Sequence, residues 1–114
     1  METSVRSSFA NSGQICLCGS RILVEDTVYD AFLSSFLSKV KDTIRVGPPT
    51  DPAATMGPVI SAAHRSKIEG MVRVALEQGG KLLLGGERPQ GDWADKGCYL
   101  LPTIIGGLGE QCQA

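Results

Sequence analysis

The stretch RILVEDTVYDAFLSSFLSKVKDTIRVGPP, residues 21–49, decides the expected fold. After Arg21 come three apolar residues with β-propensity, Ile22 to Val24, which predict a buried strand. The residues that follow predict a helix, because apolar side chains recur at steps of three and four along one face: Val28, Phe32, Phe36, Leu37, Val40 and Ile44. A strand followed directly by an amphipathic helix is typical of α/β proteins.

The ends of this helix also have local signals. Asp26 or Thr27 is the expected N-cap, since a side-chain oxygen there can accept an unpaired backbone N–H of the first turn. Pro48 and Pro49 end the helical region because proline has no backbone N–H to donate.

Downstream, a second amphipathic helix is predicted from about Ser61 to Gln78, with Gly79 as its left-handed C-terminal residue. Its expected inner face carries Ile68, Met71, Val72 and Ala75. Two further strands are predicted, KLLL at residues 81–84 and CYLLPTII at residues 98–105, with Pro102 at an edge or a bulge. The order of elements predicts an α/β class with some parallel pairing.

The composition limits the functions that the chain can have. Its 114 residues suit one domain, and 11 basic residues nearly balance 12 acidic ones, so no basic field would attract nucleic acid or a membrane surface. No apolar run approaches the roughly 20 residues that span a bilayer, and no signal-peptide pattern is present. We therefore expect a cytoplasmic protein with reduced thiols.

The stretch FANSGQICLCGSR, residues 9–21, carries the candidate chemistry. Cys16 is a candidate nucleophile, because Gly13 allows a tight turn that can direct the Cys16 backbone amide towards a developing oxyanion. Two alternatives stay open, which are that Cys16 and Cys18 are small packed side chains or that they form a metal or redox pair. The spacing argues against a metal site, since no C-x₂-C repeat accompanies the pair.

His64 lies on the second predicted helix. It can be a surface or capping residue, or a general base for Cys16. The glycine pairs at 79–80 and 85–86 do not form a nucleotide-binding motif, and we assign them to a helix stop and a strand stop.

The segment FANSGQIC resembles the active-site signature of the aldehyde dehydrogenase superfamily, with Phe9, Asn11, Gly13, Gln14 and Cys16 at the signature positions. The resemblance continues from residue 5 to residue 111 and includes GCYLLPTII, which is similar to a family strand. The ICLC tetrad looks most like the branch acting on 2-aminomuconic and 2-hydroxymuconic semialdehydes.

The resemblance implies an NAD(P)-dependent oxidation of a small aldehyde to a carboxylate, in which Cys16 forms a thiohemiacetal. It assigns the nucleophile to Cys16 and half of the oxyanion hole to its backbone amide. It also implies that His64 and Lys67 lie near the bound NAD cofactor. No metal is implied.

The family segments with the cofactor-binding domain, the oxyanion asparagine and the general-base glutamate lie upstream of the cysteine, which here is residue 16. We therefore expect residues 1–114 to be an internal part of a catalytic domain, with strands and two amphipathic helices taken from a larger, mostly parallel sheet. The alternative function is a non-catalytic fragment that packs on a full-length relative. Because unpaired strand edges favour association, we expect a homo-oligomer or a complex with a longer relative.

Overall fold

The computed structural model of the protein describes residues 2–113. The first element is helix α1 (Glu2–Phe9), which the sequence analysis did not predict. Glu2 lies in the first turn of α1, where a carboxylate complements the helix dipole, and Val5 is buried. The chain forms two compact units, one that ends at Gly57 and one that begins at Pro58. Each unit has its own small core.

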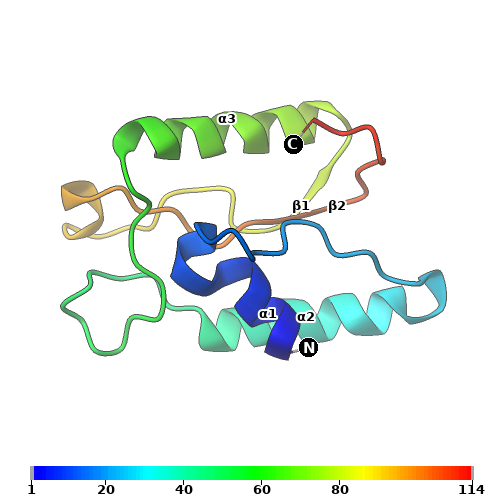
Figure 1. Cartoon of the computed structure of the whole chain (residues 1–114), viewed down its shortest axis with the longest axis horizontal. Coiled ribbons are helices and arrows are strands. Elements are labelled where there is room, and N and C mark those ends of the chain that lie inside the picture. Colours follow the sequence, from blue (N-terminus) through cyan, green and yellow to red (C-terminus); the bar gives the residue numbers. More distant parts are fainter. Residues whose placement is uncertain (1, 114) are drawn as a thin grey trace. The chain divides into compact units, whose positions relative to one another are not determined.

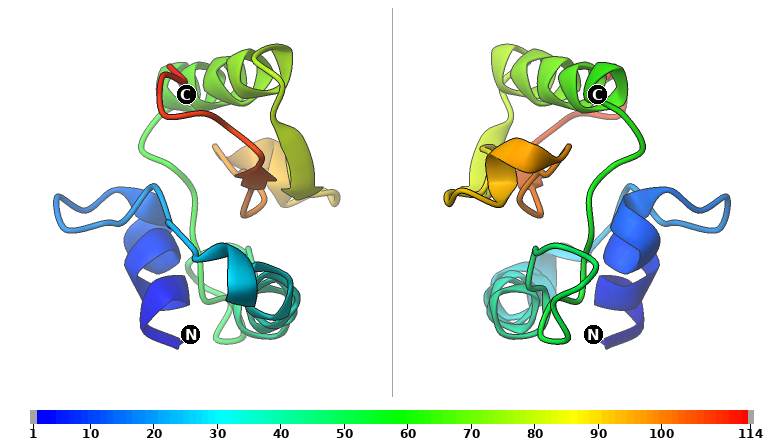
Figure 2. Two further views of the ribbon diagram at one scale, coloured as in Figure 1. Left: turned by 90° about the vertical axis from the view of Figure 1, so that its right-hand side faces the viewer. Right: turned by 90° about the vertical axis from the view of Figure 1, so that its left-hand side faces the viewer.

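In the first unit, α1 lies beside α2 (Tyr29–Thr43), as Figures 1 and 2 show. The predicted helix is confirmed, and Phe36 and Val40 are buried as expected. The predicted caps are wrong, because a 3-10 turn, η2 (Asp26–Val28), precedes α2 and places Val28 at the N-cap without a side-chain hydrogen bond. Val28, expected on the inner face, is 51% exposed.

The segment that follows α2 folds back on the end of that helix. Thr55 fixes it, because its hydroxyl donates to the Thr43 carbonyl at 2.8 Å and accepts from the Arg45 N–H at 2.8 Å. An isolated parallel bridge joins Val46 to Met56. This segment therefore has a defined position up to Gly57.

The predicted strand at Ile22 to Val24 is wrong. These residues have no assigned strand or helix, and Leu23 is 95% exposed. Local β-propensity is not sufficient for a strand, since the backbone groups need a partner to pair with.

In the second unit, α3 (Ala62–Glu77) confirms the second predicted helix. The Ser61 hydroxyl accepts from the His64 N–H at 3.1 Å, which makes Ser61 the N-cap. At the other end, the Gly79 N–H donates to Leu76 and the Gly80 N–H donates to Ala75, which is a Schellman motif with Gly79 at φ 93°.

Strands β1 (Lys81–Leu84) and β2 (Ile104–Gly106) form the two-stranded sheet. They pair antiparallel with a register shift between Leu82 and Leu84, so the expectation of parallel pairing is wrong for these two strands. Strand β2 is also shorter than predicted, because Pro102 has no N–H and the Leu101 N–H donates instead to the Glu87 carbonyl. Helices and strands are both present, as the α/β class predicted.

The core of the second unit contains Val59, Ala75, Ala94 and Tyr99. Trp93 packs edge-on against Tyr99 with ring centroids 4.9 Å apart, next to the 3-10 turn η3 (Ala94–Lys96). Such aromatic pairs stabilise a fold beyond the area that they bury.

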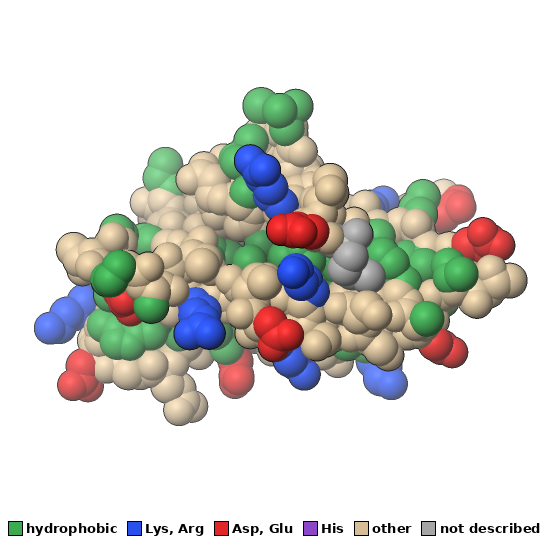
Figure 3. Space-filling model, turned by 90° about the horizontal axis from the view of Figure 1, so that it is seen from below, with side chains coloured by type: hydrophobic (Ala, Val, Ile, Leu, Met, Phe, Trp, Pro, Cys, Tyr) green, Lys and Arg blue, Asp and Glu red, His purple; other side chains and the backbone are tan. Residues whose placement is uncertain are grey.

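The surface carries both signs of charge. On the face shown in Figure 3, acidic and basic side chains are interspersed with hydrophobic ones, and neither sign gathers. None of the helices within residues 2–113 is both long and apolar enough to cross a lipid bilayer.

Candidate active site

A left-handed turn follows α1 and leads to Cys16. Asn11, Ser12 and Gly13, in the 3-10 segment η1 (Ala10–Gly13), have φ angles of 51°, 58° and 75°. The Asn11 amide donates to the Gln14 carbonyl at 3.2 Å, and the Gln14 N–H donates to the Asn11 carbonyl at 3.0 Å. Asparagine and glycine tolerate this conformation, whereas serine does so less readily.

Cys16 lies in the next turn, which the Cys18 N–H closes by donating to the Ile15 carbonyl at 3.0 Å. The Cys16 side chain is exposed. Within residues 2–113, no hydrogen bond is formed by its thiol or its backbone N–H. A reagent can therefore reach the sulfur, and the N–H is available as a donor.

The far end of this loop returns to α1. The Gly19 N–H donates to the Ser7 carbonyl at 3.2 Å and to the Ser7 hydroxyl at 3.1 Å. A Cβ at Gly19 would lie 3.0 Å from that hydroxyl, so glycine permits the close approach. Residues 10–18 thus form a loop with both ends on one helix, and Cys16 is part of it.

Cys18 differs from Cys16 in its surroundings. Its half-buried thiol lies 3.8 Å from the Ala10 carbonyl oxygen, a long contact for a weak donor. No disulfide joins the four cysteines, and in the described part of the chain no three His, Cys, Asp or Glu side chains gather as metal ligands would. Cys18 thus occupies the position of a small packed side chain.

His64 and Lys67 belong to the second unit. His64 is the third residue of α3 and is half-buried, and its backbone N–H serves the Ser61 cap. Lys67 is exposed one turn later. Their assignment to cofactor binding stays a prediction.

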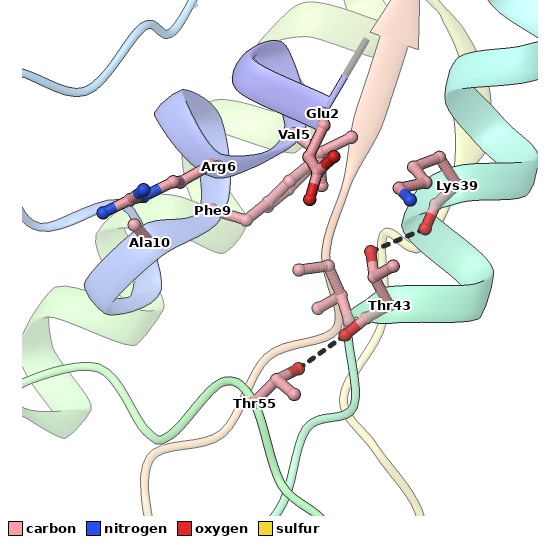
Figure 4. Close-up of a pocket in the computed structure, with 9 residues that line it drawn as sticks. Glu2, Val5, Arg6, Phe9, Ala10, Lys39, Thr43 and Thr55 are labelled. Atoms are coloured by element: carbon pink, nitrogen blue, oxygen red, sulfur yellow. Dashed lines mark hydrogen bonds between the residues drawn. The ribbon is translucent and has the colours of Figure 1, made fainter.

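The first unit holds a cavity of about 260 Å³ between α1 and the end of α2 (Figure 4). Its charged side chains come from Glu2, Arg6 and Lys39, and the remaining lining residues are Val5, Phe9, Ala10, Thr43, Ile44 and Thr55. The Thr43 hydroxyl donates to the Lys39 carbonyl at 2.6 Å, so it is already committed as a donor. The cavity is smaller than the roughly 300–1,000 Å³ of typical ligand sites and does not include Cys16.

An ion pair lies in the second unit. Arg88 donates two hydrogen bonds to Glu69, Nε to Oε1 at 2.6 Å and Nη2 to Oε2 at 3.0 Å. These bonds hold the pKa of the Glu69 carboxyl below its usual value and raise the pKa of Arg88. The pair joins α3 to the segment after β1 and has a structural role.

Sequence reasoning predicts Cys16 as the nucleophile but missed two serines that hold its loop. Ser7 bonds to Gly19, and the Ser12 hydroxyl donates to the Gly57 carbonyl at 2.9 Å. The only local signal would have been the placement of Ser12 between Asn11 and Gly13, where a left-handed turn can form.

The family model for the aldehyde dehydrogenase family matches residues 1–113, so the chain belongs to the aldehyde dehydrogenase family. Among curated relatives, 2-aminomuconic semialdehyde dehydrogenase of Bos taurus is 42% identical over 90% of this chain. The 3,6-anhydro-alpha-L-galactose dehydrogenase of Vibrio sp. (strain EJY3) is 39% identical over 92% of it. The chain spans 22% of the length of each of these relatives.

Solved structures show the same relationship. The structure of 3,6-anhydro-L-galactose dehydrogenase matches 97% of this chain with a TM-score of 0.92 and 34% identity, over 23% of its own chain. Mycobacterium tuberculosis aldehyde dehydrogenase complexed with NAD⁺ matches 96% of this chain with a TM-score of 0.90 and 35% identity, over 22% of its length. A betaine aldehyde dehydrogenase mutant from Staphylococcus aureus, in complex with NAD⁺ and with a BME-modified cysteine, matches 91% with a TM-score of 0.85 and 36% identity, over 21%. The expected fold, part of an aldehyde dehydrogenase, is confirmed.

Proposed function

We propose that this chain supplies the nucleophile of an NAD(P)-dependent aldehyde dehydrogenase, which oxidises an aldehyde to a carboxylate, and that Cys16 is that nucleophile. The observation that carries the proposal is the exposed Cys16 thiol in a loop with both ends on α1, next to a backbone N–H without a partner in the described residues. Family membership supports the reaction class.

The covalent step uses atoms of this chain. The Cys16 thiol loses its proton, and the thiolate sulfur forms a bond to the aldehyde carbon. The carbonyl π electrons move onto the oxygen, which becomes an oxyanion and takes up a proton to give a thiohemiacetal. The Cys16 N–H is free to donate to that oxyanion, which is the arrangement that lowers the barrier to acyl-type chemistry.

The described residues do not form a dinucleotide site by themselves. The lining of the cavity of about 260 Å³ includes neither Cys16 nor the two predicted cofactor contacts, and those contacts, His64 and Lys67, lie on a single helix. We therefore propose NAD(P) dependence for the whole protein, supported by relatives solved in complex with NAD⁺. His64 and Lys67 remain the side chains that we expect nearest to the cofactor.

For the substrate we propose a muconic semialdehyde. The support is the ICLC tetrad at residues 15–18 together with the similarity to 2-aminomuconic semialdehyde dehydrogenases. Such a substrate is an unsaturated chain with an aldehyde at one end and a carboxylate at the other.

The proposal is tested by acylating the chain with p-nitrophenyl acetate and locating the acetyl group by mass spectrometry. We expect acetylation at Cys16, release of p-nitrophenol at a rate that Cys16→Ser abolishes, and little change in Cys18→Ser. Cys18→Ser is a matched control two positions away in the same loop. Equal labelling of all four cysteines, or an unchanged rate in Cys16→Ser, would contradict the proposal.

A second candidate is a non-catalytic chain that associates with a longer relative or with itself. Two apolar side chains of the first unit favour it, because Leu17 is 85% exposed and Leu23 is 95% exposed. Sedimentation at several concentrations tests it, with Leu23→Ser as the variant. A monomer at every concentration and no complex with a full-length relative would exclude this function.

A further inference from the structure

Ser12 adopts a backbone conformation that a serine seldom adopts. Its φ of 58° lies in the left-handed region, between Asn11 and Gly13, which tolerate that region better. Such conformations persist only where other contacts hold them, and they concentrate at functional sites. The contact that holds Ser12 can be identified.

The Ser12 hydroxyl donates to the Gly57 carbonyl at 2.9 Å, across 45 positions of sequence. Gly57 directly follows a well-fixed segment, because the Met56 N–H donates to the Arg45 carbonyl at 3.1 Å and the Gly47 N–H donates to the Met56 carbonyl at 3.1 Å. Met56 itself is buried. The hydroxyl of Ser12 therefore joins the turn before Cys16 to the residue that follows the bonded and buried Met56.

The opposite side of the Cys16 loop is held by Gly19, whose N–H has two acceptors on Ser7. Between Ser12 and Gly19, two backbone bonds contribute to the shape of the loop: the Gln14 N–H donates to the Asn11 carbonyl and the Cys18 N–H donates to the Ile15 carbonyl. Ser12 and Gly19 thus anchor the loop on either side of Cys16, with Ser12 on the N-terminal side.

We propose that Ser12 is a positioning residue for Cys16. Its hydroxyl, bonded to Gly57, keeps residues 11–13 left-handed and so fixes the direction of the Cys16 N–H and sulfur. The inference rests on the proposed function of Cys16 as a nucleophile. It predicts that loss of the hydroxyl harms chemistry that needs an oxyanion donor more than chemistry that needs only an accessible thiol.

The test compares two reactions of Cys16 in the full chain. Acylation by p-nitrophenyl acetate passes through an oxyanion, whereas alkylation by iodoacetamide does not. In Ser12→Ala we expect acylation to slow by about tenfold and alkylation to change by less than about twofold.

Ser20→Ala is the matched control, because Ser20 is exposed in the neighbouring segment and forms no hydrogen bond within the described residues. Amide hydrogen exchange of Gln14 and Cys18 gives a readout independent of catalysis, and we expect both amides to exchange faster in Ser12→Ala only.

Equal acylation rates in Ser12→Ala and the unchanged chain would overturn the positioning role, as would unchanged exchange. Parallel losses of acylation and alkylation would also overturn it, since they indicate a change in the reactivity of the thiol itself and not in the oxyanion donor. A different result, no acetylation of Cys16 in the unchanged chain, would overturn the proposed function, and hydrogen exchange would still decide whether Ser12 holds the loop.

Discussion

Replacing Val40 with alanine should destabilise the chain strongly, because Val40 on α2 is fully buried, with 0% exposure. The change removes two methyl-sized groups, which loses about 1.6 kcal/mol of burial free energy. The cavity left behind adds up to about 1 kcal/mol, and the better helix propensity of alanine returns about 0.5 kcal/mol. We expect a net loss of about 2 kcal/mol in the free energy of unfolding.

The matched control is Val28→Ala, the same chemical change at a position that is 51% exposed and lies at the N-cap of α2. We expect it to cost less than about 0.5 kcal/mol, as surface changes usually do. Urea titration followed by circular dichroism measures both variants. For a chain of this size, the Val40→Ala loss corresponds to a fall in Tm of about 10 °C.

Equal effects of the two variants would refute the assignment of Val40 to the core and of Val28 to the surface. A loss below about 0.5 kcal/mol in the free energy of unfolding of Val40→Ala would also refute the assignment of Val40 to the core, because only a poorly packed site tolerates such a deletion. A change in the m-value would point instead to a loss of two-state unfolding.

Three further predictions concern the second unit. Ser61→Ala should cost about 1 kcal/mol by removing the N-cap of α3, and Ser61→Asp should restore most of it in the same urea titration. The folded-state pKa of Glu69 lies below its ordinary value of 4.5, so the stabilisation by Arg88 is present above that pH and is lost as the pH falls through the lowered pKa. In urea titrations across this range, Glu69→Gln should therefore lose less stability on acidification than the unchanged chain. Gly107→Ala should cost about 1 kcal/mol for its positive φ, whereas Gly85→Ala should cost about 3 kcal/mol or more, because its Cβ would also overlap the carbonyl of the proline before β2. Equal thermal stability of the two glycine variants would contradict this packing.

The elements that sequence predicted well are those with signals at both ends. Helix α3 was placed within one residue at each end, because Ser61 caps its start and Gly79 takes the left-handed position after its end. The start of α2 was placed less well. The 3-10 turn η2 carries Val28, which fits the apolar spacing of the helix, but the turn is not part of that helix. Local patterns do not distinguish these two kinds of turn.

Features that depend on distant partners were not predictable. Ile22 to Val24 have strand propensity, but the described residues offer them no strand to pair with. The antiparallel pairing of β1 with β2 depends on a turn in the backbone between them, which the strand sequences do not specify. At the candidate site, the family signature predicts Cys16 as the nucleophile, whereas the Ser12 bond to Gly57 joins residues too far apart for any local pattern.

The long connection between β1 and β2 has a consequence for how the second unit folds. Residues 85–103, nineteen in number, separate the two strands, so the chain must lose loop-closure entropy before any ladder bond forms. Helix α3, by contrast, has its cap and its Schellman motif within residues 61–80. We therefore expect the helix to form early and the ladder late, so that Ile105→Val mainly speeds unfolding, whereas Ser61→Ala slows folding. Stopped-flow measurements of folding and unfolding rates on both variants test this order. A slower folding rate in Ile105→Val would contradict it.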